Sequence, residues 1–356
     1  MSASHVDELV GKPSRWLAEP GAESDLVLST RVRLARNLKD IPFTQRAADE
    51  EMGVVVSRVV TACQSSAELG GGVFLTMAEL VELDRQFLAE RHLISREMVT
   101  ESRPAGLYLT KGERGTVMVN EEDHLRITSV VPGLELDAAW NEVRAIEEEL
   151  DAALEFAYSE DLGYLTACPT NVGTGMRLSV FLHLPSLVLT KKIRQVLRGI
   201  SQVGLAVRGF YGEGSEILGN FFQVSNQQTL GVSERETIDN LEKVTRQVME
   251  AEIRARRILL KEARLQIEDK IFRALGTLQS ARVLTATEVI NLVSAVRFGV
   301  ALGIGIPVDL LALNQLLVLT QPAHLTKMAG REMSETERNA FRADLVRERL
   351  TPGLKG

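Results

Sequence analysis

The chain has 356 residues, 45% of them hydrophobic and 25% charged, and its formal net charge is -7. This length predicts two domains, and the composition is typical of a soluble globular protein. The negative charge argues against general binding to nucleic acid. The amino terminus has acidic residues and no apolar core, and the apolar stretch 298–320 is interrupted by Pro307 and Asp309, so we expect neither a signal peptide nor a membrane span.

Cysteine usage bears on the compartment and on the metal content. Cys63 and Cys168 are the only cysteines, and their spacing fits neither a disulfide scaffold nor a metal site. We therefore expect a reducing, cytoplasmic location and no metal ion held by the protein alone.

The first part of the chain is predicted to mix strands and helices. Segments 25–37 and 176–185 alternate like half-buried strands, and apolar residues at helical spacing predict helices over about 77–92 and 137–158. The apolar strand faces consist of Leu26, Leu28, Val32 and Leu34 in the first segment and Met176, Leu178, Val180, Leu182 and Leu184 in the second. The polar faces consist of Ser29, Arg31 and Arg33 and of Arg177, Ser179 and His183.

From Ser233 onward, nearly every periodic segment predicts a helix. Capping boxes mark three helix starts, at Ser233 with Glu236, Thr285 with Glu288 and Ser334 with Glu337. The change in pattern predicts an amino-terminal extension at 1–24, a mixed domain at 25–255 and a helical domain at 256–356.

Segment 119–127, VNEEDHLRI, places three consecutive carboxylates inside an otherwise alternating strand. Strand parity puts Asn120, Glu122, His124 and Arg126 on one polar face, while the acids on either side of Glu122 interrupt the apolar face. A bulge or turn at 121–123 that redirects a carboxylate would resolve this conflict. The alternative is a charged hairpin tip in water.

Arginines recur on the polar faces of the predicted strands. They are Arg31, Arg33, Arg126 and Arg177, to which Arg208 in a glycine-bounded segment can be added. Arginine has planar, permanently charged donors that match phosphate oxygens, and several arginines on one sheet surface would repel one another unless an anion lay between them. These arginines therefore predict a polyphosphate site, the alternative being that each is separately solvated.

Two glycine-containing loops add further candidates. ACPTNVGTGMRL, 167–178, carries Cys168, and VRGFYGEGSE, 207–216, carries Glu213 between two glycines. Neither a Walker loop nor a dinucleotide fingerprint is present. Cys168 is either an activated thiol or a small buried side chain, and Glu213 is either a site carboxylate or a turn residue.

Together these segments resemble the phosphagen (guanidino) kinases and, within that family, the bacterial branch that acts on arginine in proteins. The matching stretches are STRVRLARN, NEEDHLRI, CPTNVGTGMRLSV and RGFYGEGSE, in the family's order and spacing. The resemblance continues through GNFFQVSNQQTLG and LLVLTQPAHLTKMAGRE, so it covers residues 24–349 approximately. It implies an α+β fold with a large antiparallel sheet flanked by helices, followed by an all-α C-terminal domain.

The resemblance implies an ATP site on the polar strand faces and nearby loops, with the five arginines holding the phosphates of MgATP. Phe181 stands where kinases of small guanidino compounds carry His, which leaves the adenine contact at that point open. The residues assigned to the ATP site are Ser29, Thr30, Arg31, Val32, Arg33, His92, Arg126, Arg177, Leu178, Ser179, Val180, Phe181, Arg208, Gly209, Phe210, Tyr211, Gly212 and Glu213.

The resemblance also implies the catalytic groups. Glu122 and Glu213 match the two carboxylates that grip the acceptor guanidinium, and Cys168 matches the thiol near its terminal nitrogens. A guanidinium has a pKa above about 12 and becomes a nucleophile only when its charge is met and a proton is removed. We therefore assign Glu122 as the base and orienting group, Glu213 as its partner and Cys168 as an electrostatic aid.

The acceptor is expected to be an arginine side chain on a protein. Family members that act on free arginine or creatine carry a helical amino-terminal domain of about a hundred residues, a size typical of small domains. Here residues 1–24 alone precede the first predicted strand, which favours an open site.

In the helical region, RNAFRA is similar to the family's R-D-x-x-R-A motif. This similarity implies an allosteric phosphoarginine pocket formed by Arg338, Asn339, Arg342 and Ala343, with Asn339 in place of the motif's Asp. The alternative is a solvated helix face.

The expected function is ATP-dependent phosphorylation of arginine side chains in proteins, which would mark them for a Clp-type protease. The expected partners are protein substrates, an activator protein, a Clp chaperone-protease and a second copy of the chain in a homodimer, with no nucleic acid and no membrane. The alternatives are a kinase for a small guanidino metabolite and a phosphoarginine-binding adaptor with weak catalysis.

Overall fold

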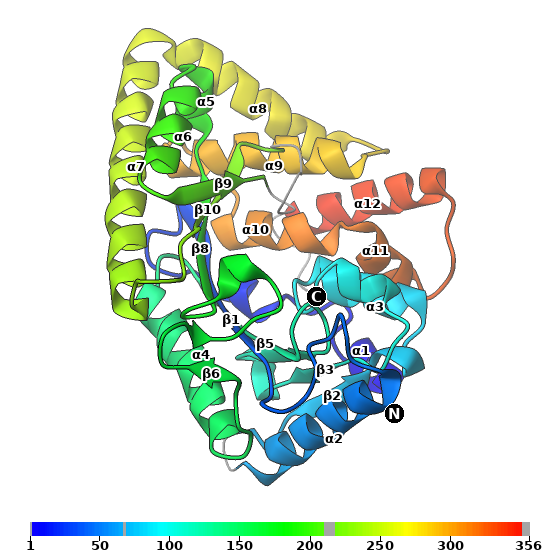
Figure 1. The fold of residues 1–356 in the computed structure, drawn as a ribbon. Helices are drawn as coiled ribbons and strands as arrows, with labels where there is room; N and C mark the ends of the chain where they lie inside the picture. Colours follow the sequence, from blue (N-terminus) through cyan, green and yellow to red (C-terminus); the bar gives the residue numbers. More distant parts are fainter. Residues whose placement is uncertain (1, 67–68, 210–217, 351–356) are drawn as a thin grey trace.

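The structure is a computed structural model that describes residues 2–66, 69–209 and 218–350. A mixed sheet-and-helix part is followed by a part built of helices alone, as Figure 1 shows. This arrangement confirms the predicted α+β fold. Among the described residues, no helix combines the length and the apolar character needed to span a bilayer.

The sheet has eight strands, and each hydrogen-bonded neighbour is antiparallel. Its spatial order is β2-β3-β4-β5-β1-β8-β10-β9, so β5 and β1 lie at its centre and β8 is the next strand after β1. The strands are β1 (Val27–Arg36), β2 (Val73–Thr76), β3 (Gly106–Leu109), β4 (Thr116–Val119), β5 (Leu125–Pro132), β8 (Met176–His183), β9 (Leu205–Arg208) and β10 (Phe221–Asn226). A separate short hairpin is formed by β6 (Tyr158–Ser159) and β7 (Gly163–Tyr164).

Helices cover both faces of the sheet (Figure 1). In the first part of the chain they are α1 (Ser2–Asp7), α2 (Asp49–Ser65), α3 (Glu82–Glu90), α4 (Leu136–Asp151), α5 (Pro185–Leu189) and α6 (Ile193–Gln202). In the last part they are α7 (Glu234–Glu262), α8 (Arg264–Ser280), α9 (Ala286–Ala301), α10 (Leu310–Leu319), α11 (Pro322–Ala329) and α12 (Glu335–Leu350).

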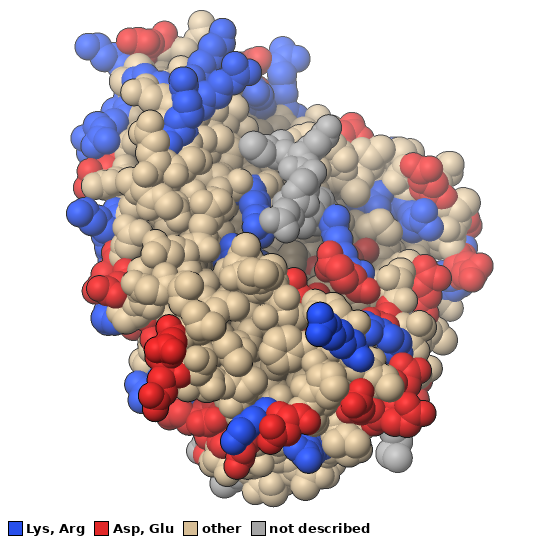
Figure 2. Space-filling model, viewed as in Figure 1, with Lys and Arg blue, Asp and Glu red and all other residues tan. Residues whose placement is uncertain are grey.

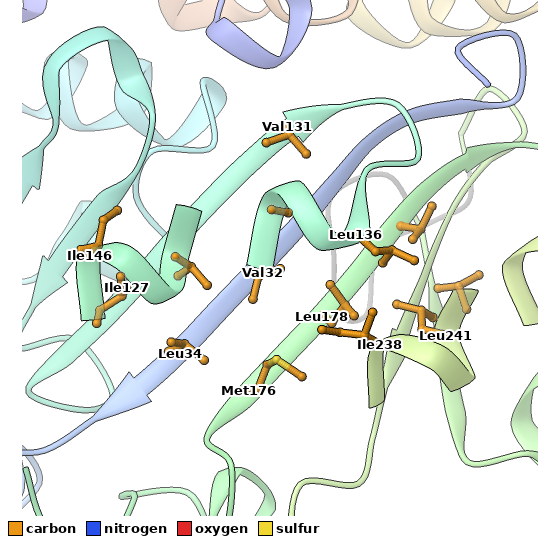
Figure 3. Close-up of a cluster of buried hydrophobic side chains, with 14 of the residues drawn as sticks. Val32, Leu34, Ile127, Val131, Leu136, Ile146, Met176, Leu178, Ile238 and Leu241 are labelled. Atoms are coloured by element: carbon orange, nitrogen blue, oxygen red, sulfur yellow. The ribbon is translucent and has the colours of Figure 1, made fainter. Parts of the chain in front are cut away.

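The apolar face of the central strands packs on α2, α4 and α7 and forms the largest hydrophobic core. Figure 3 shows Val32 and Leu34 of β1 in this core, beside Leu178 of β8 and Ile238 of α7. Burial of these side chains on one face leaves the alternate residues of each strand on the other. The second face is therefore the polar one that the alternation predicted.

One prediction about β1 is wrong. Leu28 was placed on the same face as Val32, but it packs with the carboxy-terminal helices on the other side of the sheet, whereas Val27 lies in the main core. The pairing of β1 with β8 shifts register between Val27 and Ser29. Such an irregularity reverses the side-chain parity on one side of it, which simple alternation cannot anticipate.

The polar face is covered at two places by separate apolar clusters. One joins Leu28 and Phe221 to α8, α9, α10 and α12, and the other joins β2, β3 and β4 to α3. Between the two clusters, the central strands carry arginines instead of apolar side chains.

The predicted helices are present with different ends. The segment 77–92 is a 3₁₀ turn followed by α3, and the helix predicted to reach 158 ends at Asp151. Beyond it, Phe156 pairs with Leu38 and Ala157 donates to the Asn37 carbonyl, so contacts distant in sequence end the helix. The capping boxes at the starts of α7, α9 and α12 are confirmed by reciprocal hydrogen bonds.

The predicted domain boundary at residue 255 lies inside the continuous helix α7. Ala255 belongs to the main core, whereas Leu259 packs against a cluster of α8 and α9 residues. The helix thus contacts the sheet along most of its length and the helical region at its end. The exact boundary stays a prediction.

Candidate active site

A cleft of about 890 Å³ opens on the polar face of the sheet, between the two apolar clusters that cover it. In Figure 2 basic side chains border a hollow on the drawn face. Its lining draws on β1, β5, β8, β9 and β10, on the 168–175 loop and on α10. The predicted site residues that line it are Arg31, Arg33, His92, Glu122, Arg126, Cys168, Arg177 and Arg208.

The cleft arginines, which we define as Arg31, Arg33, Arg126, Arg177 and Arg208, converge because of the strand register. Arg33 on β1 lies directly opposite Arg177 on β8. Like charges in directly opposed positions destabilise a sheet, and nothing in the packing of this face requires them. The sheet thus holds a repulsive arrangement that an anion would relieve.

Two of the cleft arginines lack side-chain partners among the described residues. Neither the Arg31 nor the Arg33 guanidinium makes a hydrogen bond or ion pair there, and Nε of Arg33 is buried. Burial, followed by repulsion from Arg126 and Arg208, lowers the pKa of Arg31 to about 10. Burial and then the four other cleft arginines lower the pKa of Arg33 well below its ordinary value. A polyanion would supply the missing oxygens.

Arg126 and Arg177 are held in place by neighbouring groups. Arg126 contacts Glu121 at 2.6 Å and Glu122 at 3.3 Å. Arg177 donates to the backbone carbonyl of Asn226 at 3.2 Å and to the Asn171 side chain at 3.3 Å. These contacts fix the direction of two guanidinium groups and leave further donors for a ligand.

The NEEDH segment is the connection between β4 and β5, so the predicted turn is confirmed. Its tip is not a solvated one, because Asn120 and His124 are fully buried and Asp123 is 2% exposed. The His124 ring contacts the backbone N–H of Leu38 and the Pro42 carbonyl, so it does not share the cleft face with Glu122 as the parity predicted. A strand rule does not apply inside a turn.

The three consecutive acids have three different environments. The Glu121 side chain is 7% exposed and contacts Arg126, whereas the Glu122 side chain is 37% exposed and faces the cleft. Asp123 accepts from the Asn37 amide and from the Ala167 backbone N–H, both at 2.6 Å. Burial raises the pKa of Asp123, while those hydrogen bonds oppose the rise. Glu122 is therefore the most accessible of the three acids to an incoming group.

Asp123 also explains why Cys168 lies beside Glu122. By binding the N–H of Ala167, Asp123 holds the segment whose next residue, Cys168, lines the cleft. The Cys168 thiol lies 3.0 Å from the Thr170 hydroxyl, and the Asn171 amide lies 3.5 Å from the Glu122 carboxylate. The other cysteine, Cys63, is in the core, where burial raises its pKa to about 12.

His92 reaches the cleft from the turn that follows α3. Its backbone is left-handed with a φ of 64°, an uncommon conformation for a residue with a side chain. The ring meets Trp16 edge-on with 5.7 Å between centroids. Burial, then the nearby Arg31 and Arg96, lower the pKa of His92 to about 3, so the imidazole is neutral near pH 7.

Several residues of the predicted ATP set do not line the cleft. Val32, Leu178 and Val180 point into the main core, Thr30 donates to the Gly133 carbonyl, and Phe181 packs on Phe221 at 5.6 Å. The others without a place in the cleft lining are Ser29, Ser179 and Gly209. Phe210, Tyr211, Gly212 and Glu213 lie outside the described residues.

The predicted phosphoarginine pocket stays a prediction. Arg342 is 2% exposed and donates to the backbone carbonyls of Thr320 and Leu284 and to the Asn339 side chain. Arg338 donates to the Met333 carbonyl, and Ala343 is fully buried. Arg342 thus ties α12 to the segments around Thr320 and Leu284, whereas Arg338 contacts the loop that precedes α12.

The sequence interpretation missed several residues of the cleft. Gln223 alternates with buried neighbours on β10, so strand parity could have identified it. The carboxy-terminal helices add Leu317, Val318 and Gln321, for which no local signal exists. The other missed lining residues with polar side chains are Glu90, Ser95, Arg96, Glu97, Glu101, Glu121, Thr170, Asn171 and Gln227.

Comparison with solved structures finds guanidino kinases. The duplicated taurocyamine kinase from Schistosoma mansoni matches with 27% identity and a TM-score of 0.57, over 67% of this chain and 35% of that one. The chain thus spans about a third of that duplicated enzyme. Lombricine kinase matches with 23% identity and a TM-score of 0.58, over 68% of this chain and 71% of that one, which shows the shared fold.

Comparison with protein families and curated sequences covers nearly the whole chain. The ATP:guanido phosphotransferase C-terminal catalytic domain matches residues 54–255, and the protein-arginine kinase McsB C-terminal domain matches residues 264–354. A protein-arginine kinase of Pelotomaculum thermopropionicum is 47% identical over 94% of this chain and 95% of its own length. One of Symbiobacterium thermophilum is 46% identical over 97% of this chain and 99% of its own. The chain therefore belongs to the ATP:guanido phosphotransferase family and, within it, to the protein-arginine kinases.

Proposed function

We propose that the chain transfers the γ-phosphoryl group of MgATP to a guanidino nitrogen of arginine side chains in proteins. The observation that carries the proposal is the placement of Glu122 and Cys168 at the edge of a wall of cleft arginines. Relatives named protein-arginine kinase, at 44–47% identity over most of the chain, support the choice of acceptor.

The cleft arginines would act on the donor. Phosphoryl transfer depends mainly on alignment of the reactants and on neutralisation of charge on the transferring group. Arg31 and Arg33 have guanidinium donors without partners among the described residues, so they need no rearrangement to meet phosphate oxygens. Mg²⁺ would enter with the nucleotide, since it commonly keeps several waters and binds phosphates with one or two carboxylates. Glu121, which lines the cleft beside Arg126, would be the carboxylate left for the ion, because Glu122 acts on the acceptor.

Glu122 would act on the acceptor. Its half-exposed carboxylate can meet the charge of an arriving guanidinium and take one N–H proton as the nitrogen attacks. The new N–P bond forms as the bond from the γ-phosphorus to the bridging oxygen breaks, and ADP leaves with that oxygen. Cys168 would stabilise the acceptor from the adjacent wall, and Glu213 stays the predicted second carboxylate.

The proposal is tested by acceptor choice. Incubation with labelled ATP should place acid-labile label on arginines of an unstructured protein substrate, and Glu122→Gln should reduce the rate at least about 100-fold, the range of a catalytic acid–base group. An exposed carboxylate remote from the cleft provides a control, for which we choose Glu262→Gln. Label on free arginine but not on protein would instead indicate the metabolite kinase. Unchanged labelling by Glu122→Gln would contradict the mechanism.

The wider role stays a prediction. It comprises marking of proteins for a Clp-type protease, control by an activator protein, assembly as a homodimer and a cytoplasmic location. None of these is needed for the chemistry proposed above.

A further inference from the structure

An exposed apolar surface lies beside the wall of the cleft that carries Cys168. We call it the rim patch and define it as Tyr158, Leu162 and Leu230, which are 60%, 46% and 47% exposed. Tyr158 belongs to β6, Leu162 precedes β7, and Leu230 follows β10. Tyr158 and Leu162 belong to one hairpin, and Leu230 belongs to a segment distant in sequence. Exposed apolar side chains that gather from distant segments differ from the singly scattered ones that are normal on a protein surface.

Close backbone packing joins the hairpin to the Leu230 segment through the segment that contains Gly173. A Cβ on Gly163 would lie 2.6 Å from the Gly173 carbonyl oxygen, and a Cβ on Gly173 would lie 2.8 Å from the Leu230 Cα. Both glycines have positive φ, and a side chain at either position would push these segments apart. Leu162 and Leu230 therefore flank the same backbone segment, the one that contains Gly173.

That segment is also the wall of the cleft. Thr229 donates its hydroxyl to the carbonyls of Thr170 and Val172, and Thr170 lines the cleft next to Asn171. The rim patch thus continues outward from the place where the acceptor guanidinium would meet Glu122.

The charge of this surface differs from that of the phosphate wall. No Lys or Arg occurs between Arg144 and Arg177, or between Arg208 and Arg235, whereas Glu160 and Asp161 are exposed at the tip of the β6–β7 hairpin. In Figure 2 the face over β6 and the adjoining loops is mainly uncharged. The rim patch is therefore apolar with an acidic border.

We infer that the rim patch binds the polypeptide on either side of the target arginine and selects extended segments with an apolar residue next to that arginine and a basic residue nearby. This inference rests on the proposed function. When the target guanidinium reaches Glu122, its backbone must leave the cleft across the adjoining wall. Apolar neighbours can then cover Tyr158, Leu162 and Leu230, and a basic neighbour meets Glu160 and Asp161.

Two synthetic peptides test the apolar part. Both have one arginine in the same unstructured glycine-serine sequence, flanked by leucine in one and by glycine in the other. The wild-type protein should have a kcat/KM about tenfold higher for the leucine peptide, mainly through KM, as expected for burial of a few methylene groups. A Tyr158→Ser, Leu162→Ser, Leu230→Ser variant should treat both peptides alike. Leu265→Ser, at a side chain 76% exposed on α8, is the matched control and should keep the preference.

A third peptide tests the acidic border. It carries lysine two residues from the arginine, and a Glu160→Lys, Asp161→Lys variant should raise its KM about threefold at low salt and much less at 0.5 M salt, because exposed charges are screened.

The outcomes separate the inference from the function it rests on. If the wild type phosphorylates none of the peptides, the proposed function fails, and this inference fails with it. If the wild type phosphorylates both peptides equally, or the triple serine variant keeps the preference, the rim patch does not select substrates and the proposed function stands. The inference would also be overturned if the triple serine variant had a kcat/KM reduced by the same factor for both peptides, since that pattern indicates a general structural defect.

Discussion

Arg33 and Arg36 lie three residues apart on β1 and differ in every contact of their guanidinium groups. Arg36 is 1% exposed; its guanidinium binds Glu147 at 2.6 Å, donates to two backbone carbonyls and lies 3.4 Å from the centroid of the Tyr164 ring. Arg33 faces other arginines, and its buried Nε has no partner in the part of the chain that the structure describes.

The difference shows how a structural arginine can be told from one that binds a ligand. An unpaired Nε does not make this distinction alone, because the Nε atoms of Arg91 and Arg256 also lack a hydrogen bond within the described part of the chain, although both guanidinium groups are ion-paired. What distinguishes Arg33 is that its whole guanidinium lies among like charges and makes no hydrogen bond or ion pair with the described residues, an arrangement that a bound anion would relieve. Arg36 therefore stabilises the fold, and Arg33 is expected to stabilise a bound anion.

The largest expected effect comes from removal of Arg33. Arg33→Met should lower kcat/KM for ATP-dependent phosphorylation by between about 10³-fold and 10⁵-fold, the range measured for arginines that neutralise a transferring phosphoryl group. Because its charge is repelled in the folded state, the variant should be at least as stable as the wild type in urea. If Arg33→Met were inactive because it is unfolded, Arg33 would be a structural arginine like Arg36.

Removal of Arg36 should have the opposite signature. Arg36→Met leaves the Glu147 carboxylate without its ion pair and two carbonyls without donors, which should lower the free energy of unfolding by about 3 kcal/mol. Urea unfolding monitored by circular dichroism measures this change. At low temperature, where the variant is still folded, its phosphorylation rate should stay within about tenfold of the wild type, well short of the Arg33→Met effect. A normal unfolding midpoint would show that the buried pair contributes little.

The smallest expected effect is a pH dependence of the free energy of unfolding, caused by His92. Its pKa of about 3 in the folded protein is below the value of about 6.5 expected in the unfolded chain. The unfolded chain therefore binds a proton that the folded protein does not bind, and the stability from His92 is complete above about pH 6.5 and is lost as the pH falls toward about 3. This loss cannot exceed ~1.4 kcal/mol per pH unit.

The His92 contribution is measured by urea unfolding of the wild type and of His92→Gln between pH 7 and pH 5. The free energy of unfolding of the glutamine variant should change less steeply with pH than that of the wild type. ATP should also make the stability of the wild type less dependent on pH, since its phosphates would offset the charge of Arg31, which helps to lower the pKa of His92. A slope that ATP leaves unchanged would indicate that the cleft arginines do not meet the phosphates.

Alternation in single strands predicted much of the site. It placed Arg31, Arg33 and Arg177 on the polar faces of two strands, and the register of β1 with β8 then brought them together. It could not find Leu317, Val318 or Gln321, because these side chains reach the cleft through the packing of α10 and α11 onto the other elements.

The turn between β4 and β5 shows the same limit of local pattern. The sequence predicted a turn that singles out Glu122, and the structure has that turn. The separate environments of Glu121 and Asp123 depend on Arg126 across the turn and on Asn37 and Ala167 from distant segments. Local pattern therefore identified the crowding of charge, and tertiary contacts decided which acid is exposed.

The sequence by itself determined the fold class, the polar strand faces, three capped helix starts and the family, because these depend on periodicity and on the order of short segments. Tertiary structure alone decided that Arg33 has no partner among the described residues while Arg36 has several, that Leu28 changes face at an irregularity in β1, and that the β6–β7 hairpin and the Leu230 segment pack together beside a wall of the cleft. The physical reason is that burial and pairing depend on which distant residues come within a few ångströms, and no local pattern encodes that distance.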